Sequence, residues 1–487
     1  MVAEPKSYDF GYSRPEVAAI DPGGGAGQGV DMRRFLFPLL AAALVAPAPA
    51  QTPDPSSQRD PQIEKIVQEI SPANIEANIR RLVGFKTRHT LSSTTDPEQG
   101  IGAARNWIKG EFERYSRESG GRLEVAFDPF LQPPTPPRVM HEVEIVNVVA
   151  TLRGKQPASA DRVYVVSGHY DSRSLNPLLG EPYAPGGNDD ASGTAAVMEL
   201  ARVMSKYEFD ATIVFMTVAA EEQGLLGAKH WADTAKKNKV NVAGMLDNDI
   251  IGSSHADDGR QDNHHVRLFA EGVPPAQPLA DEIVSQIRTG GENDFATRQL
   301  ARAIRETALV YVPQMQVQVI YRRDRFLRGG DHSPFLDDGF AAVRFTEPNE
   351  DYRHQHEDPR MVDGVQIGDL PEFDDFDYIA NVARVNAAAL ANLASAPAAP
   401  ANVEVETLKL ENDTVLRWAP NAEPDLAGYR IVWRETTSPF WEHSAWAGNV
   451  TRYTVKKLSK DNYLFGVEAV DKDGHASPAV YPKPAQR

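Results

Sequence analysis

Short apolar segments alternate with amphipathic ones between residues 61 and 395 of the chain. The apolar segments are rich in Val and Ile, which is typical of buried strands, whereas residues 193–207 repeat apolar positions at helical spacing. This alternation predicts an α/β fold with a mostly parallel sheet covered by helices. The predicted strands cover 143–152, 162–167, 211–218 and 240–247, a helix begins at Pro61, and another closes the region over 374–394.

Residues 253–300 depart from this alternation, because they are polar and irregular. They predict an insertion over the edge of the sheet or over the site. Three histidines lie in this segment, and we interpret them as ordinary polar residues rather than as a third metal site: His255, His264 and His265.

The last part of the chain has another character. An Ala- and Pro-rich linker over 396–402 precedes short alternating strands over 403–487, which predict a small β-sandwich. Trp418, Tyr429 and Tyr463 give this segment a resemblance to a fibronectin type III module. The alternative is an integral β-subdomain of the preceding domain. If this segment is a separate module, we expect it to contact a surface or polymer rather than to take part in catalysis.

The N-terminus has the pattern of a secretory signal peptide. Two arginines follow Met32, a short apolar core comes next, and small residues precede Gln51. An anchor helix is the alternative, but Pro38 and Pro47 argue against it. The pattern predicts a secreted or periplasmic protein with no transmembrane segment in the mature chain. The predicted parts are an upstream segment that is not native (1–31), a signal peptide (32–50), a linker (51–60), the α/β domain (61–395), a linker (396–402) and the β-sandwich (403–487).

The net charge and the cysteine content of the chain exclude some classes of partner and of metal ligand. The chain has 51 Lys and Arg against 68 Asp and Glu, a net charge of −17, which argues against nucleic acid or an anionic membrane as the main partner. It has no cysteine, so a zinc ion could be held only by histidines and carboxylates.

Such residues follow the predicted strands, and in an open α/β sheet sites are built beyond the carboxyl ends of the strands. Singly, each has an ordinary explanation as a surface histidine, a helix cap or a turn former. Together they provide what two metal ions about 3.5–4 Å apart require, which is a bridging carboxylate with a histidine and a carboxylate on each side. The candidates are His169, Asp171, Asp189, Asp190, Glu221, Glu222, Asp249 and a late histidine, His354 or His356.

Two pairs among these residues suggest divided roles. Glu221 and Glu222 are adjacent, which provides one metal ligand and one free general base. Asp171 lies two residues after His169 and could accept the other imidazole N–H, which fixes the tautomer.

Five segments in order resemble the co-catalytic di-zinc peptidases of the aminopeptidase Y and glutamate carboxypeptidase type, over about residues 145–395. They are Ser167-Gly-His-Tyr-Asp-Ser, Gly187-Asn-Asp-Asp-Ala-Ser-Gly-Thr, Ala220-Glu-Glu-Gln-Gly-Leu-Leu-Gly, Asp247-Asn-Asp-Ile-Ile-Gly and Gly330-Asp-His-Ser-Pro-Phe. The resemblance implies a three-layer α/β/α phosphorylase/hydrolase-like sandwich.

By that resemblance, His169 and Asp249 would hold one zinc ion. Asp189 would bridge the ions, next to a cis peptide bond with Asp190. Glu222 and the late histidine would hold the second ion, and Glu221 would be the general base.

The late histidine is ambiguous. His354 has Asp358 four residues later, as in the family, whereas His356 fits relatives with a His-Gln-His run and is favoured. The tyrosine that often precedes this ligand is absent from both positions. Tyr352 or an arginine of residues 321–325 would have to replace it.

The leading hypothesis is a secreted aminopeptidase that hydrolyses peptides with two Zn²⁺ ions, in which acidic residues near the metals could hold the α-ammonium group. A carboxypeptidase, a glutaminyl-cyclase-like enzyme and a non-catalytic binding protein remain as alternatives. The sequence contains neither the Gly-x-Ser-x-Gly pattern of serine hydrolases nor the His-Glu-x-x-His pattern of thermolysin-type enzymes.

Overall fold

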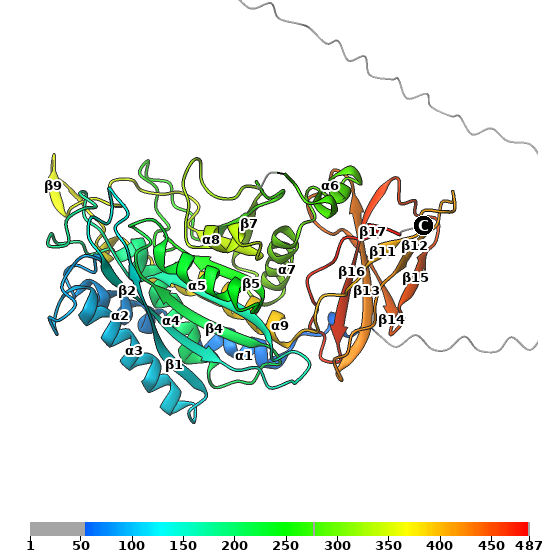
Figure 1. The fold of residues 1–487 in the computed structure, drawn as a ribbon, viewed down its shortest axis with the longest axis horizontal. Helices are drawn as coiled ribbons and strands as arrows, with labels where there is room; N and C mark the ends of the chain where they lie inside the picture. The colour runs from blue at the N-terminus through cyan, green and yellow to red at the C-terminus, as the bar shows by residue number, and fades with distance from the viewer. Residues whose placement is uncertain (1–53, 276–277, 486–487) are drawn as a thin grey trace, which may run out of the picture. The chain divides into compact units, whose positions relative to one another are not determined.

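A mixed eight-stranded sheet forms the centre of the protein in the computed structural model, which describes residues 54–275 and 278–485 (Figure 1). The expected upstream segment and signal peptide lie outside the described residues. The strand order is β1-β2-β4-β3-β5-β8-β6-β7. Four of the seven pairings are parallel and three antiparallel. The strands are β1 (Leu123–Gln132), β2 (Val143–Leu152), β3 (Arg162–His169), β4 (Thr212–Val218), β5 (Asn241–Asn248), β6 (His265–Ala270), β7 (Gln316–Ile320) and β8 (Ala342–Thr346).

Helices cover both faces of this sheet, so the predicted three-layer α/β/α architecture is confirmed. The larger apolar core packs α1–α4, α7 and α9 against one face, and a smaller core packs α5 and α8 against the other. The helices are α1 (Pro61–Glu69), α2 (Pro72–Val83), α3 (Gly100–Glu118), α4 (Gly193–Met204), α5 (Leu226–Lys237), α6 (Asp281–Arg288), α7 (Ala296–Tyr311), α8 (His332–Asp337) and α9 (Phe376–Ser395). None of these helices, within the described residues, is long and apolar enough to cross a lipid bilayer.

The expectation of an irregular insertion over 253–300 is wrong. Strand β6 lies inside the sheet between β8 and β7, and α6 and the start of α7 follow it. The strand is short and starts at His265, so only Val266, Leu268 and Phe269 stand out as apolar in a polar stretch. Its inner position depends on long-range pairing with β7 and β8, which local periodicity does not report.

Two glycines let α4 approach the ends of the central strands. A Cβ on Gly168, in β3, would lie 2.5 Å from the backbone carbon of Gly193. A Cβ on Gly193 would lie 2.0 Å from the carbonyl oxygen of Asn248, at the end of β5. Because neither position has room for a side chain, the segment before α4 lies against the carboxyl ends of β3 and β5.

The C-terminal segment forms the predicted β-sandwich. One sheet has the order β15-β12-β11-β17 and the other β14-β13-β16. Both sheets contribute to one apolar core, which includes Leu416, Tyr429 and Val467. A fibronectin type III relationship stays a prediction. The strands are β11 (Glu404–Val405), β12 (Thr414–Arg417), β13 (Leu426–Glu435), β14 (His443–Gly448), β15 (Arg452–Val455), β16 (Tyr463–Asp471) and β17 (Lys483–Pro484).

Buried ion pairs join the β-sandwich to the α/β part. Asp294, just before α7, accepts from Arg434 of β13 at 2.7 Å and from Arg302 of α7 at 2.9 Å. These three side chains are nearly inaccessible to solvent. Residues Gln51–Arg487 accordingly form one compact unit. That residues 403–487 fold independently stays a prediction.

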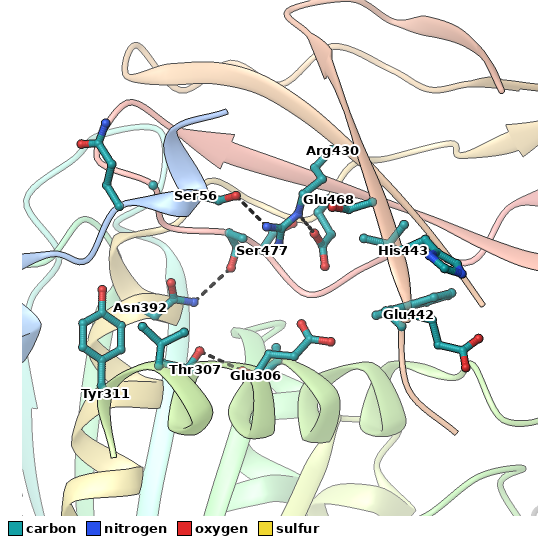
Figure 2. A pocket seen from close by; sticks show the side chains of 18 residues that line it. Ser56, Glu306, Thr307, Tyr311, Asn392, Arg430, Glu442, His443, Glu468 and Ser477 are labelled. Carbon is teal, nitrogen blue, oxygen red and sulfur yellow. Dashed lines mark hydrogen bonds and ion pairs between the residues drawn. The ribbon is translucent and has the colours of Figure 1, made fainter. Parts of the chain in front are cut away.

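A cavity of about 320 Å³ lies between α7 and strands β13, β14 and β16 (Figure 2). Arg430 donates to Glu468 and to Ser56, both at 2.6 Å. Glu306 of α7 also lines this cavity, and its burial together with the charge of Glu468 raises its pKa to about 8. The Glu306 carboxyl is therefore largely protonated at neutral pH.

Candidate metal centre

The candidate site lies beyond the carboxyl ends of β3, β4 and β5. His169 is the last residue of β3, Glu221 and Glu222 follow β4, and Asp249 follows β5. The two pairings that join these strands are parallel, so their carboxyl ends meet at one edge of the sheet. Asp189 reaches the same edge from the π-helical turn Gly187–Ser192 before α4.

The first group of possible ligands consists of His169, Asp189 and Asp249. Their ligand atoms lie within 4.8 Å of one another. His169 Nε2 is 3.1 Å from Asp189 Oδ1 and 3.9 Å from Asp249 Oδ1. All three residues are buried, so an ion there would be largely shielded from solvent.

The second group consists of Asp189, Glu222 and His356. His356 Nε2 is 2.8 Å from Asp189 Oδ2 and 3.0 Å from Glu222 Oε1. Asp189 thus directs one carboxylate oxygen to each histidine, which is the arrangement that a bridging ligand requires.

His354 lies outside both groups. Its ring stacks on Phe373 with centroids 3.7 Å apart, and its Nδ1 is 3.8 Å from Asp351. Of the two late histidines, the structure therefore brings only His356 to Asp189.

Asp171 lies beside the other imidazole nitrogen of His169 and also contacts the loop of the two glutamates. The His169 Nδ1 is 3.2 Å from the backbone oxygen of Asp171 and 3.5 Å from its carboxylate. The carboxylate also accepts the backbone N–H groups of Glu221 and Glu222, at 3.3 and 3.4 Å. Asp171 thus orients both the imidazole and the loop that carries the two glutamates.

Asp190 supports the backbone rather than offering a ligand atom. Its carboxylate accepts the N–H groups of His169 and Gly193, each at 2.9 Å. The expected cis peptide bond between Asp189 and Asp190 is present.

Two residues that the sequence analysis did not identify position the ligands. Asp369 accepts the N–H of Asp189 at 2.8 Å and that of Asn188 at 2.7 Å. Arg344, fully buried in β8, pairs with Asp249 at 2.9 Å. The charge inside the apolar run 341–346 was a usable signal for Arg344, whereas Asp369 lies in a loop with no distinctive pattern.

Backbone strain gathers at the same place. Ala220 precedes Glu221 with φ 63°, Ile250 follows Asp249 with φ 58°, and His356 has φ 58°. Left-handed backbone costs a residue with a side chain about 1–2 kcal/mol. Such strain concentrates at functional sites, where the surrounding structure holds it.

The carboxylates of the site favour positive charge on the two histidines. Burial alone would lower the pKa of His356, but Glu222 and Asp189 raise it to about 10. Burial would likewise lower the pKa of His169, but the adjacent carboxylates of Asp171 and Asp189 raise it well above 6.5.

Two buried polar atoms without a hydrogen bond indicate that the site binds a cation. His169 Nε2 and Glu222 Oε1 are buried and have no hydrogen-bond partner within the described residues. Imidazole nitrogens and carboxylate oxygens without thiolates form the ligand type of catalytic zinc. The residues present therefore fit zinc.

Glu221 differs from its neighbour. It belongs to neither ligand group, and within the described residues its carboxylate has no hydrogen-bond or ion-pair partner. Burial, with the charges of Asp249 and Glu222, raises its pKa well above the ordinary value. It lines a cavity of about 290 Å³ that opens onto both ligand groups.

Residues 147–363 match the model of peptidase family M28, and this segment contains every candidate ligand. A probable zinc metalloprotease of Pyricularia oryzae is 48% identical over 431 residues, which cover 87% of this chain and 85% of that protein. Another, of Leptosphaeria maculans, is 47% identical over 91% of this chain and 100% of its own length. The chain belongs to peptidase family M28.

Among solved structures, the LapA aminopeptidase of Legionella pneumophila aligns with 19% identity and a TM-score of 0.48, over 69% of this chain and 76% of that one. The glutaminyl cyclase of Porphyromonas gingivalis aligns with 15% identity and a TM-score of 0.46, over 66% and 97%. As a member of family M28 with relatives named as zinc metalloproteases, the protein is a zinc metallopeptidase.

Proposed function

We propose that the protein is a secreted, co-catalytic two-zinc exopeptidase that removes residues from the free N-terminus of peptides. The observation that carries this proposal is the position of Asp189, whose two oxygens face His169 and His356 separately. The adjoining cavity of about 290 Å³ is near the lower limit for ligand pockets. A cavity of that size suits the end of a peptide better than the middle of a long chain.

Zinc ions at these positions would polarise the peptide carbonyl and lower the pKa of a bound water. Glu221 is the residue that takes up a proton from the attacking water and transfers it to the leaving nitrogen as the carbon–nitrogen bond breaks. Its unpaired carboxylate in the cavity is suited to this role, because no hydrogen bond has to be broken first.

The surrounding residues hold this arrangement in place. Asp171 orients His169 and the Glu221–Glu222 loop through the contacts described above. Arg344 and Asp369 hold Asp249 and the backbone of Asp189. Small displacements of reacting groups cost rate steeply, so these residues support catalysis without contacting the substrate.

The family's tyrosine, which is absent here, would have stabilised the carbonyl oxygen of the substrate, and an arginine can take this role. Tyr352 is 60% exposed and does not line the cavity, whereas Arg325 does. Its guanidinium pairs with Asp324 at 3.0 Å, which fixes its direction. We assign to Arg325 the stabilisation of the carbonyl oxygen.

Metal analysis combined with a substrate panel tests the proposal. We expect close to two zinc ions per chain and loss of activity with a strong chelator. Amino-acid anilides should be cleaved, and N-acetylated peptides should not. One zinc ion with full activity would favour a cyclase-like enzyme, and equally fast cleavage of N-acetylated peptides at the C-terminal residue would favour a carboxypeptidase.

The two ends of the chain concern the export of the enzyme and its attachment to a surface or polymer. The signal-peptide pattern over 32–50 supports a secreted or periplasmic enzyme. The β-sandwich contributes none of the candidate ligands, which supports a role in contact with a surface or polymer.

A further inference from the structure

Four arginines line the cavity beside the metal centre. Arg138 comes from the segment between β1 and β2, Arg173 follows β3, and Arg325 and Arg328 follow β7. The carboxylates of this lining are Asp189, Glu221, Glu222 and Asp249. Two divalent ions held by these carboxylates would offset their negative charge. The positive charge of those arginines that have no other partner would then remain.

Two of these arginines already form ion pairs with carboxylates of the protein. Glu350 lies 3.3 Å from Arg325 Nη1 and 2.8 Å from Arg328 Nη1. Arg325 is also paired with Asp324. The unsatisfied positive charge of the cavity therefore comes mainly from the other two arginines.

Arg138 and Arg173 lack a carboxylate of their own. Arg138 is half-buried and donates to the backbone oxygen of Glu222 at 3.1 Å, and no carboxylate among the described residues lies within 4 Å of its guanidinium. Arg173, 13% exposed, donates to the backbone oxygen of Ser174 at 3.2 Å, and the one carboxylate within 4 Å of its guanidinium among the described residues is Glu222, at 3.7 Å. Because Glu222 is a candidate zinc ligand, its charge is not available to Arg173 alone.

A guanidinium that is partly removed from water and has no counter-charge of its own favours an anionic partner, and its planar fork matches a carboxylate. We propose that Arg138 and Arg173 form a subsite for a carboxylate of the peptide substrate, on the Glu222 side of the metal centre. The enzyme therefore prefers short peptides that present a carboxylate, terminal or side-chain, at this subsite. This inference rests on the proposed peptidase function and specifies its substrate class.

The carboxylate has two possible sources. A dipeptide presents its C-terminal carboxylate one residue from the scissile bond, and an Asp or Glu side chain presents the same group at a similar distance. An ammonium group is poorly matched to Arg138 and Arg173, because guanidinium groups are themselves positively charged.

The test measures the ratio of kcat/KM for paired substrates. Ala-Ala is compared with Ala-Ala amide for the terminal source, and Glu-Ala amide with Gln-Ala amide and Ala-Glu amide with Ala-Gln amide for the side-chain source. The parent enzyme should prefer the carboxylate member of at least one pair by about tenfold or more, and that pair identifies the source. Arg138→Gln should bring the ratio close to one, mainly through KM, and Arg138→Lys should restore only part of it.

Arg322→Gln is the matched control, because Arg322 is an exposed arginine outside the cavity that stacks on Phe326. It should keep the parent ratio. A parent enzyme indifferent to the carboxylate in every pair would overturn the subsite, as would an Arg138→Gln variant that retains the parent ratio.

A binding experiment separates this inference from the proposed function. The zinc-loaded Glu221→Gln variant is titrated with Ala-Ala, Glu-Ala amide, Ala-Glu amide and their neutral counterparts by calorimetry. Selective binding of a carboxylate, together with an inactive parent enzyme, would support the subsite and refute the peptidase proposal. Activity in the parent enzyme without selective binding of a carboxylate would support the peptidase proposal and refute the subsite.

Discussion

Replacing Glu221 and Glu222 separately by glutamine distinguishes a general base from a ligand at adjacent positions. Because the Glu221 carboxylate has no partner among the described residues, Glu221→Gln leaves no buried group unpaired. The variant should keep its fold and its zinc. Removal of a general base typically lowers the rate by about 10²–10⁴-fold. We expect a loss of that size in kcat, with little change in KM.

Glu222→Gln should behave differently. The Glu222 carboxylate is buried and lies 3.0 Å from His356 Nε2 and 3.7 Å from Arg173. Glutamine removes the charge that a second ion needs at this position. The zinc content should fall from near two ions per chain towards one, and excess zinc should restore part of the activity.

Three measurements on each variant decide the matter: zinc content by mass spectrometry, hydrolysis of an amino-acid anilide, and the thermal unfolding midpoint. The parent protein treated with chelator and reloaded with zinc is the control. If Glu221→Gln loses zinc while Glu222→Gln keeps it and loses turnover, the assignment of the pair is wrong. Equal losses of zinc in both would show that the two carboxylates act as one ligand set.

Four further predictions follow from other contacts. His356→Ala should lose zinc and His354→Ala should lose less, and equal zinc contents in His356→Ala and the parent would transfer the role to His354. Because the pKa of His356 is raised from 6.5 to about 10, zinc must displace a proton below that pH; calorimetry should show apparent zinc affinity rising with pH, and a flat profile would contradict this. The pKa of Glu306 is raised from 4.5 to about 8, so its ionisation destabilises the folded state increasingly across that range; Glu306→Gln should raise the melting temperature more at pH 8 than at pH 5, and an equal effect would refute the burial argument. The exported chain should begin near Gln51 by N-terminal sequencing, and finding residues 1–31 intact would refute the signal-peptide interpretation.

The sequence by itself determined the centre of the fold and most of the candidate site. Strands β2, β4 and β5 are short apolar runs, so periodicity locates them within a residue or two. His169 and Asp249 stand at the ends of such runs. Because the carboxyl ends of parallel strands converge, strand ends in the sequence become neighbours in space without further information.

Only the tertiary structure decided what depends on loops and long-range pairing. The loop after β8 could have presented His354 or His356, and stacking of His354 on Phe373 leaves His356 to face Asp189. Arg138 and Arg173 come from loops on separate strands, and nothing local in either loop predicts that both reach Glu222. Side chains that meet through loops depend on backbone paths set by the packing of the whole domain, whereas side chains at strand ends depend on the order and direction of the strands.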